Sequence, residues 1–358
     1  MKKSLLALAV LGAYAGVASA QSSVTLYGTV DLNGRYVKND GVDKRWSLGR
    51  DGINSSQLGF RGTEDLGGGL KAGFLLLSSV GADSGDIGAG QSATGSGKFW
   101  TRRATVSLFS NAGELRLGRD YTPTFWNNTI FDAFGTNGLG DSTHVLQVAT
   151  TTFVRADNSV GYFLPSNIGG FYGQFMAAAA EPGQAGQASN NGRYLGGRVG
   201  FAAGPFDVAF AYSQQRDAGG PGSGQTQDTW NIGGAYDFGF LKLMGYYDQD
   251  KRDNVGKEDR WSIGAVIPLG QGEIHLGYDQ SNLNLDAAGV PDNKQRKYAA
   301  TYQYNLSKRT AMYGTIALLD NGDLAAASIS PQGTGTPAGV KEIGGKSKGF
   351  EVGIRHFF

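Results

Sequence analysis

Apolar and polar side chains alternate, residue by residue, along much of this chain. Between positions 24 and 36, even-numbered residues such as Leu26 and Val30 are apolar, while odd-numbered residues such as Asp31 and Asn33 are polar. Successive side chains of a β-strand point to opposite faces, so this segment predicts a strand with one apolar and one polar face. The same alternation returns in segments 206–213, 241–248, 273–279, 297–305 and 350–358.

The composition fits strands that have lipid on one side and water on the other. Glycine accounts for 58 of 358 residues, far above the usual ~7%, and aromatic residues are plentiful. A disordered chain would lack the aromatic residues, and no stretch after Ala20 is apolar and long enough for a membrane helix. In a transmembrane β-barrel the two faces average out, as they do in this sequence.

The expected strands are joined by connections of two kinds. Short connections rich in glycine, asparagine and proline lie at 64–69, 111–113, 165–170, 202–205, 237–239, 270–272 and 305–308. Longer polar loops lie at 37–54, 80–97, 121–151, 181–191, 216–227, 251–258, 282–293 and 321–345. This alternation predicts an all-β fold, a closed antiparallel transmembrane barrel of about sixteen strands with its short turns on the periplasmic side. Closure is required because an open edge in lipid would leave backbone groups unpaired.

The first twenty residues predict an export signal that is removed. Lys2 and Lys3 precede a short apolar run over 5–17, and Ala18-Ser19-Ala20 is a small-residue cleavage site. The alternative is an N-terminal membrane anchor, but nothing beyond Ala20 prolongs the run toward the ~20 apolar residues that a spanning helix needs. We therefore expect a single barrel domain over residues 21–358.

Charge and cysteine content exclude several functions. The chain has 32 Lys and Arg against 31 Asp and Glu, and losing Lys2 and Lys3 leaves 30 against 31, which is no basic excess for nucleic acid. The absence of cysteine excludes disulfides and thiolate metal sites. The three histidines are far apart in the sequence, so we predict no metal site and no cofactor.

Enzymatic motifs are absent as well. Ser142 and His144 are close in sequence, but no Gly-x-Ser-x-Gly elbow surrounds Ser142. Gly67–Gly69 lacks the Lys and Ser/Thr of a phosphate loop, and the acidic residues between 248 and 259 lack the spacing of a calcium loop. We predict no catalytic residue and no enzyme activity.

Aromatic residues cluster near the expected strand ends. Two interfacial girdles would explain them, although ordinary strand propensity is an alternative. They are Tyr27, Tyr36, Trp230, Tyr236, Phe238, Tyr246, Tyr247, Trp261, Tyr302, Tyr304, Phe357 and Phe358.

Several motifs resemble one known family. Residues 22–28 read SSVTLYG, 57–70 read QLGFRGTEDLGGGL, 115–119 read LRLGR, 305–310 read NLSKRT, and 353–358 read GIRHFF. Together they resemble the general porins of Neisseria and related β-proteobacteria over the whole mature chain. The resemblance implies a homotrimer in the outer membrane, in contact with its lipids and lipopolysaccharide, that lets small hydrophilic solutes and ions diffuse through. It also implies that the terminal Phe358 is an assembly signal read by the barrel-assembly machinery.

The segment 121–151 is the expected third loop. It contains Phe125, Trp126, Phe131 and Phe134, which need a wall to pack against. The resemblance implies that this loop folds into the barrel and narrows it; the alternative is an external cap over the mouth.

Ion selection in such a pore rests on fixed charges, because rings of arginine or lysine favour anions. The resemblance assigns Arg102 and Arg155 to wall positions of the constriction and Asp132 to the folded loop. Gln57 occupies a position where relatives often carry arginine. These residues imply a modest anion preference.

The face of the strand on which each residue falls in the alternation, its parity, tests these assignments in part. It places Gln57, Arg61 and Lys71 on the polar face, and Arg35 and Arg116 are further lumen candidates. Parity does not support Arg102, because Val106 and Leu108 share its face, so that choice rests on the resemblance. The alternatives are an anion- or phosphate-specific channel with a saturable site, an enzyme on a barrel, and a soluble β-sandwich.

Overall fold

The computed structural model describes residues 23–41, 44–88, 98–145, 153–180, 192–216, 225–286, 293–322, 325, 327–329 and 343–358. The predicted export signal lies outside these residues. So do the end of the predicted third loop, from residue 146 to 151, the whole predicted loop over 181–191, and parts of those over 80–97, 216–227, 282–293 and 321–345.

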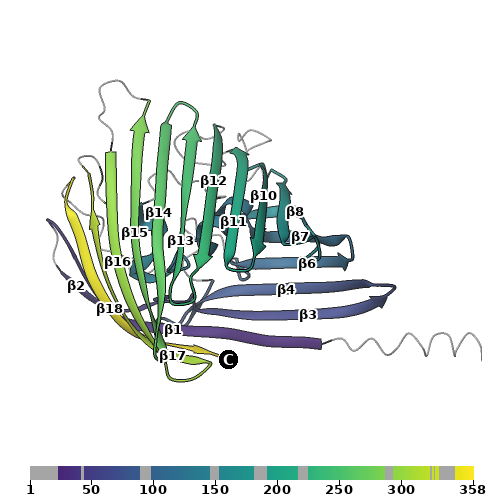
Figure 1. The fold of residues 1–358 in the computed structure, drawn as a ribbon, viewed down its shortest axis with the longest axis horizontal. Helices are drawn as coiled ribbons and strands as arrows, with labels where there is room; N and C mark the ends of the chain where they lie inside the picture. The colour runs from purple at the N-terminus through teal and green to yellow at the C-terminus, as the bar shows by residue number, and fades with distance from the viewer. Residues whose placement is uncertain are drawn as a thin grey trace, which may run out of the picture.

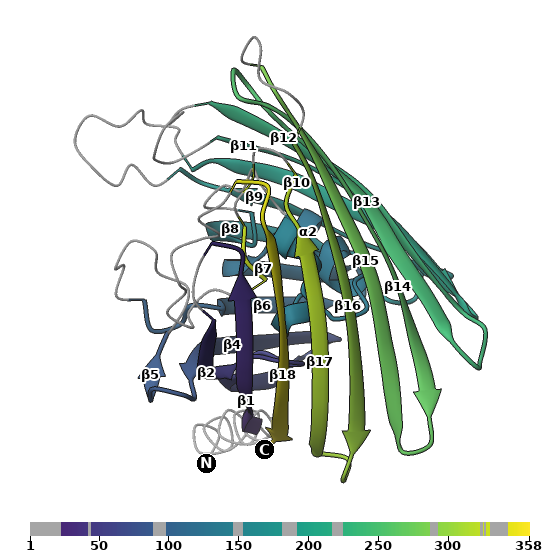
Figure 2. The same ribbon diagram turned by 90° about the vertical axis from the view of Figure 1, so that its left-hand side faces the viewer.

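The described strands form one closed antiparallel sheet (Figures 1 and 2). The barrel closes because β1 pairs with β18, from Thr29 opposite Phe357 to Asn39 opposite Ser347. Sixteen strands make the wall, which confirms the predicted architecture. They are β1 (Ser23–Asn39), β3 (Gln57–Gly67), β4 (Leu70–Gly81), β6 (Arg103–Ser110), β7 (Gly113–Tyr121), β8 (Arg155–Phe163), β9 (Phe171–Ala178), β10 (Tyr194–Ala203), β11 (Phe206–Arg216), β12 (Thr226–Asp237), β13 (Lys242–Arg252), β14 (Gly256–Leu269), β15 (Gly272–Leu285), β16 (Asn293–Asn305), β17 (Thr310–Asp320) and β18 (Lys346–Phe357).

Two further strands are short. The C-terminal half of β1 pairs with β2 (Arg45–Arg50), and its N-terminal half pairs with β3. The two strands β2 and β3 therefore act as one interrupted strand of the wall. The other, β5 (Asp86–Ile87), pairs with the end of β4.

The predicted short turns all fall between paired strands, but two predicted long loops are wrong in extent. Residues 45–50 form β2 rather than loop, and β13 and β14 pair as far as Arg252 opposite Gly256, which leaves only a tight turn. At the ends of β13 and β14 both faces carry polar residues, so alternation disappears from the sequence although the strands go on. In β2 the alternation is present, with Trp46 and Leu48 exposed on one face, but the strand is only six residues long.

The two faces of the wall differ as the alternation predicts. On β1, Leu26 is 53% exposed on the outward face, whereas Asp31 is fully buried on the inward face. The same holds on β16, where Tyr298 is 48% exposed and Lys297 fully buried. The apolar residues therefore surround the barrel and the polar residues line it.

Outward-facing aromatic rings contact one another across neighbouring strands. Trp261 lies 5.2 Å from Tyr278, whose ring lies 5.0 Å from Tyr298. Such rows support the girdle interpretation, because strand propensity alone would not align rings across strands. Tyr27 and Tyr246, however, belong to the inward face: Tyr246 is buried and donates to Ser142 Oγ.

The helices lie in the connection between β7 and β8. Helix α2 (Pro123–Ile130) begins after Thr122, whose hydroxyl accepts the Phe125 N–H at 3.4 Å, and proline at the first helical position suits this start. The short 3₁₀ helices η1 (Gly138–Gly140) and η2 (Ser142–Val145) follow. Among the described residues, none of the helices has the length and apolar character needed to cross a bilayer.

Candidate functional site: the loop after β7 and the wall opposite it

The described part of the loop, residues 122–145, lies along the polar face of β10 to β18. We call this face the covered wall, and we call the inward face of β1, β3, β4 and β6–β8 the open wall. On the covered wall, Asn127 Nδ2 donates to Asn231 Oδ1 at 2.9 Å and Asn128 Nδ2 donates to Asp248 Oδ2 at 3.2 Å. His275 Nδ1 lies 2.6 Å from the Ala133 carbonyl oxygen. Hydrogen bonds with side chains of successive strands therefore hold the loop.

Glycines on the covered wall make room for the loop. A Cβ on Gly233 would lie 2.2 Å from the Phe131 ring, and a Cβ on Gly277 would lie 2.5 Å from the Phe134 ring. Phe131 is fully buried in the space over Gly233. Burying one such side chain stabilises the docked loop by about 1.5–3 kcal/mol.

Lys297 and Glu351 anchor the second half of the loop. Lys297 Nζ donates to the Gly140 carbonyl at 2.7 Å and to the Asp141 carbonyl, and forms an ion pair with Asp279 at 3.2 Å. Glu351 Oε1 accepts the Leu139 N–H at 3.2 Å while its other oxygen pairs with Arg35 at 2.7 Å. These side chains are fully or almost fully buried, so their charges serve the loop and one another.

Asp132 holds the loop together from within. Its carboxylate accepts the N–H groups of Phe134, Thr136 and Ser142 at 2.9–3.2 Å. Burial, and then the nearby carboxylate of Asp141, raise the pKa of Asp132. Asp132 is thus engaged within the loop and does not form an ion pair with Arg102 or Arg155.

Arg102 and Arg155 come together on the open wall, where β6 and β8 begin. Both donate to the Tyr121 hydroxyl, at 2.8 and 2.9 Å, and the Arg155 guanidinium lies 4.5 Å from the centre of the Tyr121 ring. Tyr121 in turn stacks on Phe125 of α2 at 5.6 Å. Two guanidinium groups thus meet at the point where the loop leaves the wall.

Arg61 extends this cationic surface along the open wall, and Arg103 lies nearby, paired with Asp120. Together with Arg102, they are electrostatic neighbours of the inward-facing Tyr27. A hollow of about 560 Å³, lined by both polar and apolar residues, opens beside Arg61 and Arg103. Arg103 is not among the predicted site residues, although it shares the polar face of its strand with Thr105.

The other predicted residues have different surroundings. Gln57 begins β3 opposite Thr29 and Ser79, and Lys71 is exposed near the turn between β3 and β4. Arg35 differs from expectation, since its guanidinium is fully buried against Glu351 and is not offered to the lumen.

Arg116 is also neutralised, by Glu114 at 2.8 Å and Asp120 at 2.5 Å. Asp120 further pairs with Arg103 at 2.7 Å. Sequence parity had no means of finding these partners. At the end of the chain, Phe358 exchanges backbone hydrogen bonds with Gly28 at 3.1 and 3.2 Å, which extends the closing pair of strands.

Comparison with known proteins identifies the family. Residues 7–324 match the family model of Gram-negative porins. The chain is 42% identical to outer membrane porin protein 32 of Delftia acidovorans over the full length of both chains. It belongs to the Gram-negative porins.

Solved structures agree. An anion-selective porin from Comamonas acidovorans superimposes with a TM-score of 0.82 at 39% identity, covering 94% of this chain and 100% of that one. OmpT of Vibrio cholerae, solved in a trimer form, shares the fold with a TM-score of 0.65 at 15% identity and covers 94% of this chain and 99% of that one. This porin is accordingly an outer-membrane protein and a passive channel rather than an enzyme.

Proposed function

We propose that the porin prefers anions, and that selection occurs between the docked loop and the arginines of the open wall. The observation that carries the proposal is the pair formed by Arg102 and Arg155 around Tyr121. Among the described residues, no carboxylate lies within ion-pair distance of Arg102 or Arg61. Cations that lack such partners raise the local anion concentration in a narrow aqueous passage.

On the opposite side of the passage, charged groups bind one another or the loop. Asp132 accepts several N–H groups, and Arg260 of the covered wall is paired with both Asp248 and Asp250. We therefore assign the anion-attracting field to the open wall. Gln57 contributes no charge there, which keeps the proposed preference modest.

A reversal-potential measurement in a salt gradient tests the proposal. The double variant Arg102→Ala, Arg155→Ala should lower the anion/cation permeability ratio by about twofold or more. As a control, Lys257→Ala on the outward face removes an exposed cation without altering the lumen. If the double variant keeps the wild-type ratio, the assignment is wrong.

A phosphate-specific channel is the alternative within the same fold. It requires a saturable site, so phosphate would block chloride current with a measurable half-saturating concentration. Current that falls only in proportion to the loss of chloride would support general diffusion of small hydrophilic solutes and ions.

We further propose a homotrimer whose contact includes the outward face of β6–β8. Arg119 shares a face with the exposed Leu117, yet pairs with Asp157 at 2.6 Å, and Lys98 pairs with the same carboxylate. Charged groups on a lipid face cost up to about 2–4 kcal/mol each, so a neighbouring subunit is a better environment for them. An Arg119→Ala, Asp157→Ala variant should convert heat-labile trimers to monomers at a lower temperature on unheated gels.

Two proposals concern biogenesis. Residues 1–20 are removed on export, which N-terminal sequencing of the mature protein would test by finding Gln21 first. Phe358 is read by the barrel-assembly machinery, so its deletion should lower the amount of folded porin in the outer membrane while leaving synthesis unchanged.

A further inference from the structure

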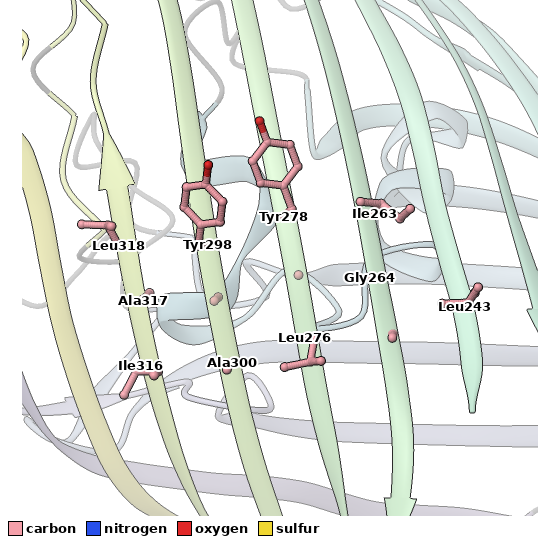
Figure 3. A pocket seen from close by; sticks show the side chains of 13 residues that line it. Leu243, Ile263, Gly264, Leu276, Tyr278, Tyr298, Ala300, Ile316, Ala317 and Leu318 are labelled. Carbon is pink, nitrogen blue, oxygen red and sulfur yellow. The ribbon is translucent and has the colours of Figure 1, made fainter. Parts of the chain in front are cut away.

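The outward face of β13 to β17 carries an apolar hollow of about 560 Å³ (Figure 3). Ala265 and Ala300 face outward on either side of Leu276, and the register places these residues side by side on β14, β15 and β16. The small alanine side chains leave a recess that Ile263 and Ile316 border. A recess of this size on the lipid-facing surface exposes hydrocarbon that lipid chains can cover.

Tyr278 and Tyr298 stand at one end of the hollow. Their rings lie 5.0 Å apart, and Figure 3 shows both hydroxyls pointing the same way along the strands. The Tyr278 hydroxyl donates to Gln280 Oε1 at 3.0 Å and also interacts with the Arg296 guanidinium. The hollow therefore has an apolar body and one polar end.

Cationic residues continue beyond this polar end. Arg296 lies across from Gln280, and Lys294 lies across from Asn282, one outward row further along. Each row adds about 6.6 Å, because a strand rises ~3.3 Å per residue. Within the described part of the chain, no carboxylate lies within ion-pair distance of Arg296 or Lys294, and Asp320, the neighbour of Arg296, pairs with Lys346 at 3.9 Å.

The direction of β15 assigns the hollow to one leaflet. The strand begins at the short turn over residues 270–271, on the periplasmic side, and runs past Tyr278 and Gln280 toward the outside. The polar end and its cations thus lie at the outer surface. The hollow also lies half-way round the barrel from β7, so the proposed subunit contact leaves it open to lipid.

We propose that this hollow is a binding site for a phosphorylated, multiply acylated glycolipid of the outer leaflet, the lipid A part of lipopolysaccharide. One acyl chain fills the recess over Ala265 and Ala300. Arg296 and Lys294 bind a phosphate group, since paired cations at a membrane surface attract anionic headgroups. The tyrosine hydroxyls lie between these two regions, at the level where acyl chains join a polar headgroup.

Binding of purified lipid A to the delipidated, detergent-solubilised porin tests the proposal, with native mass spectrometry as the readout. The Lys294→Gln, Arg296→Gln variant should bind lipid A about tenfold more weakly, because it removes two surface cations. Ala300→Phe, which fills the recess, should weaken binding to a similar extent. Dipalmitoyl phosphatidylethanolamine, which carries no net charge, should bind the wild type at least about tenfold more weakly than lipid A.

Matched controls lie elsewhere on the outward face. Lys38→Gln, Lys348→Gln removes two exposed cations from paired positions of β1 and β18, and Ala177→Phe enlarges an exposed alanine on β9. Both should retain lipid A as the wild type does. Equal retention by the headgroup variant, or equal affinity for phosphatidylethanolamine, would overturn the proposal. Because all these changes lie outside the lumen, reversal potentials should stay at the wild-type value even if lipid binding is lost, which separates this test from that of ion selection.

Discussion

Cationic side chains have opposite environments on the covered wall and on one part of the open wall, where Arg35, Arg103 and Arg116 are paired but Arg61 and Arg102 are not. On the covered wall, Lys297 and Arg260 are buried and each pairs with carboxylates. On the open wall, Arg61 is exposed and Arg102 is bound to a phenol rather than to a carboxylate. A buried, paired charge stabilises structure but has little effect on a passing ion, whereas a hydrated, unpaired charge acts on the ion and contributes little to stability.

Lys297→Met should have the largest effect on stability and on current fluctuations of the changes that compare the two walls. It leaves Asp279 buried without its partner and removes the donor from two loop carbonyls, at a cost of about 3–5 kcal/mol. We expect a lower unfolding temperature and larger current fluctuations as the loop moves. The same change at the exposed Lys71 should leave both unchanged. Equal thermal stability of the two variants would contradict the distinction between the walls.

Gly277→Val tests whether the space over the wall glycines, rather than the hydrogen bonds to the wall, sets the position of the loop. The new side chain would occupy the place of the Phe134 ring, so we expect the loop to shift and the single-channel conductance to change. Gly34→Val is the matched control, since a Cβ there meets nothing within 4 Å. A wild-type conductance in Gly277→Val would show that the loop tolerates displacement of this ring.

Strand alternation predicted the fold well because it is a local property. Lumen and lipid impose a two-residue period on each strand, and glycine-rich turns mark where each hairpin reverses. At 45–50 the alternation is present, with Trp46 and Leu48 on one face, but it extends over only six residues. The period failed at 251–258, where β13 and β14 leave the apolar band and both faces are polar. There the sequence of a strand does not differ from that of a loop.

The site was less predictable, because the environment of a charge depends on residues far away in sequence. Arg35 and Glu351 are 316 positions apart, and nothing near Arg35 indicates that it is paired and buried. Parity alone favoured Arg103 over Arg102, while the family resemblance favoured Arg102. The structure brings both near Tyr27, because Arg102 precedes the regular part of β6 and does not follow its alternation.

Arg61→Gln should have a smaller effect, on ion selectivity and not on stability, which further distinguishes the open wall from the covered wall. The side chain is exposed and lies 5.2 Å from the Tyr27 ring centre, so its loss should change stability by less than about 0.5 kcal/mol. The anion/cation ratio should fall slightly, by less than in the double variant at positions 102 and 155. Reversal potentials and thermal melts measured on the same preparation would decide; a stability loss without a selectivity change would place Arg61 with the structural charges.

The smallest predicted effect is a pH dependence confined to the loop. Burial and Asp141 raise the pKa of Asp132 above its unfolded value, so ionised Asp132 costs stability. That cost is present in full above the folded-state pKa and disappears as the pH falls below the unfolded value near 4. Current fluctuations caused by the loop should therefore decrease as the pH is lowered from neutral toward the unfolded value near 4.

Asp132→Asn provides the control for this titration, because its side chain keeps an acceptor oxygen but has no proton to gain. Its fluctuations should vary less with pH than those of the wild type. Fluctuations that increase in acid in the wild-type channel would reverse the sign assigned to Asp132.

The distribution of the loop's partners also has a consequence for how the channel is made. Thr124 lies near Ser213 of β11, Asn127 bonds to Asn231 of β12, and Leu139 bonds to Glu351, which belongs to the last strand. The loop precedes all of these strands in the chain, so it has nowhere to dock until they have been laid down. An incompletely assembled barrel would therefore lack the constriction, and its lumen would narrow only once these strands have paired.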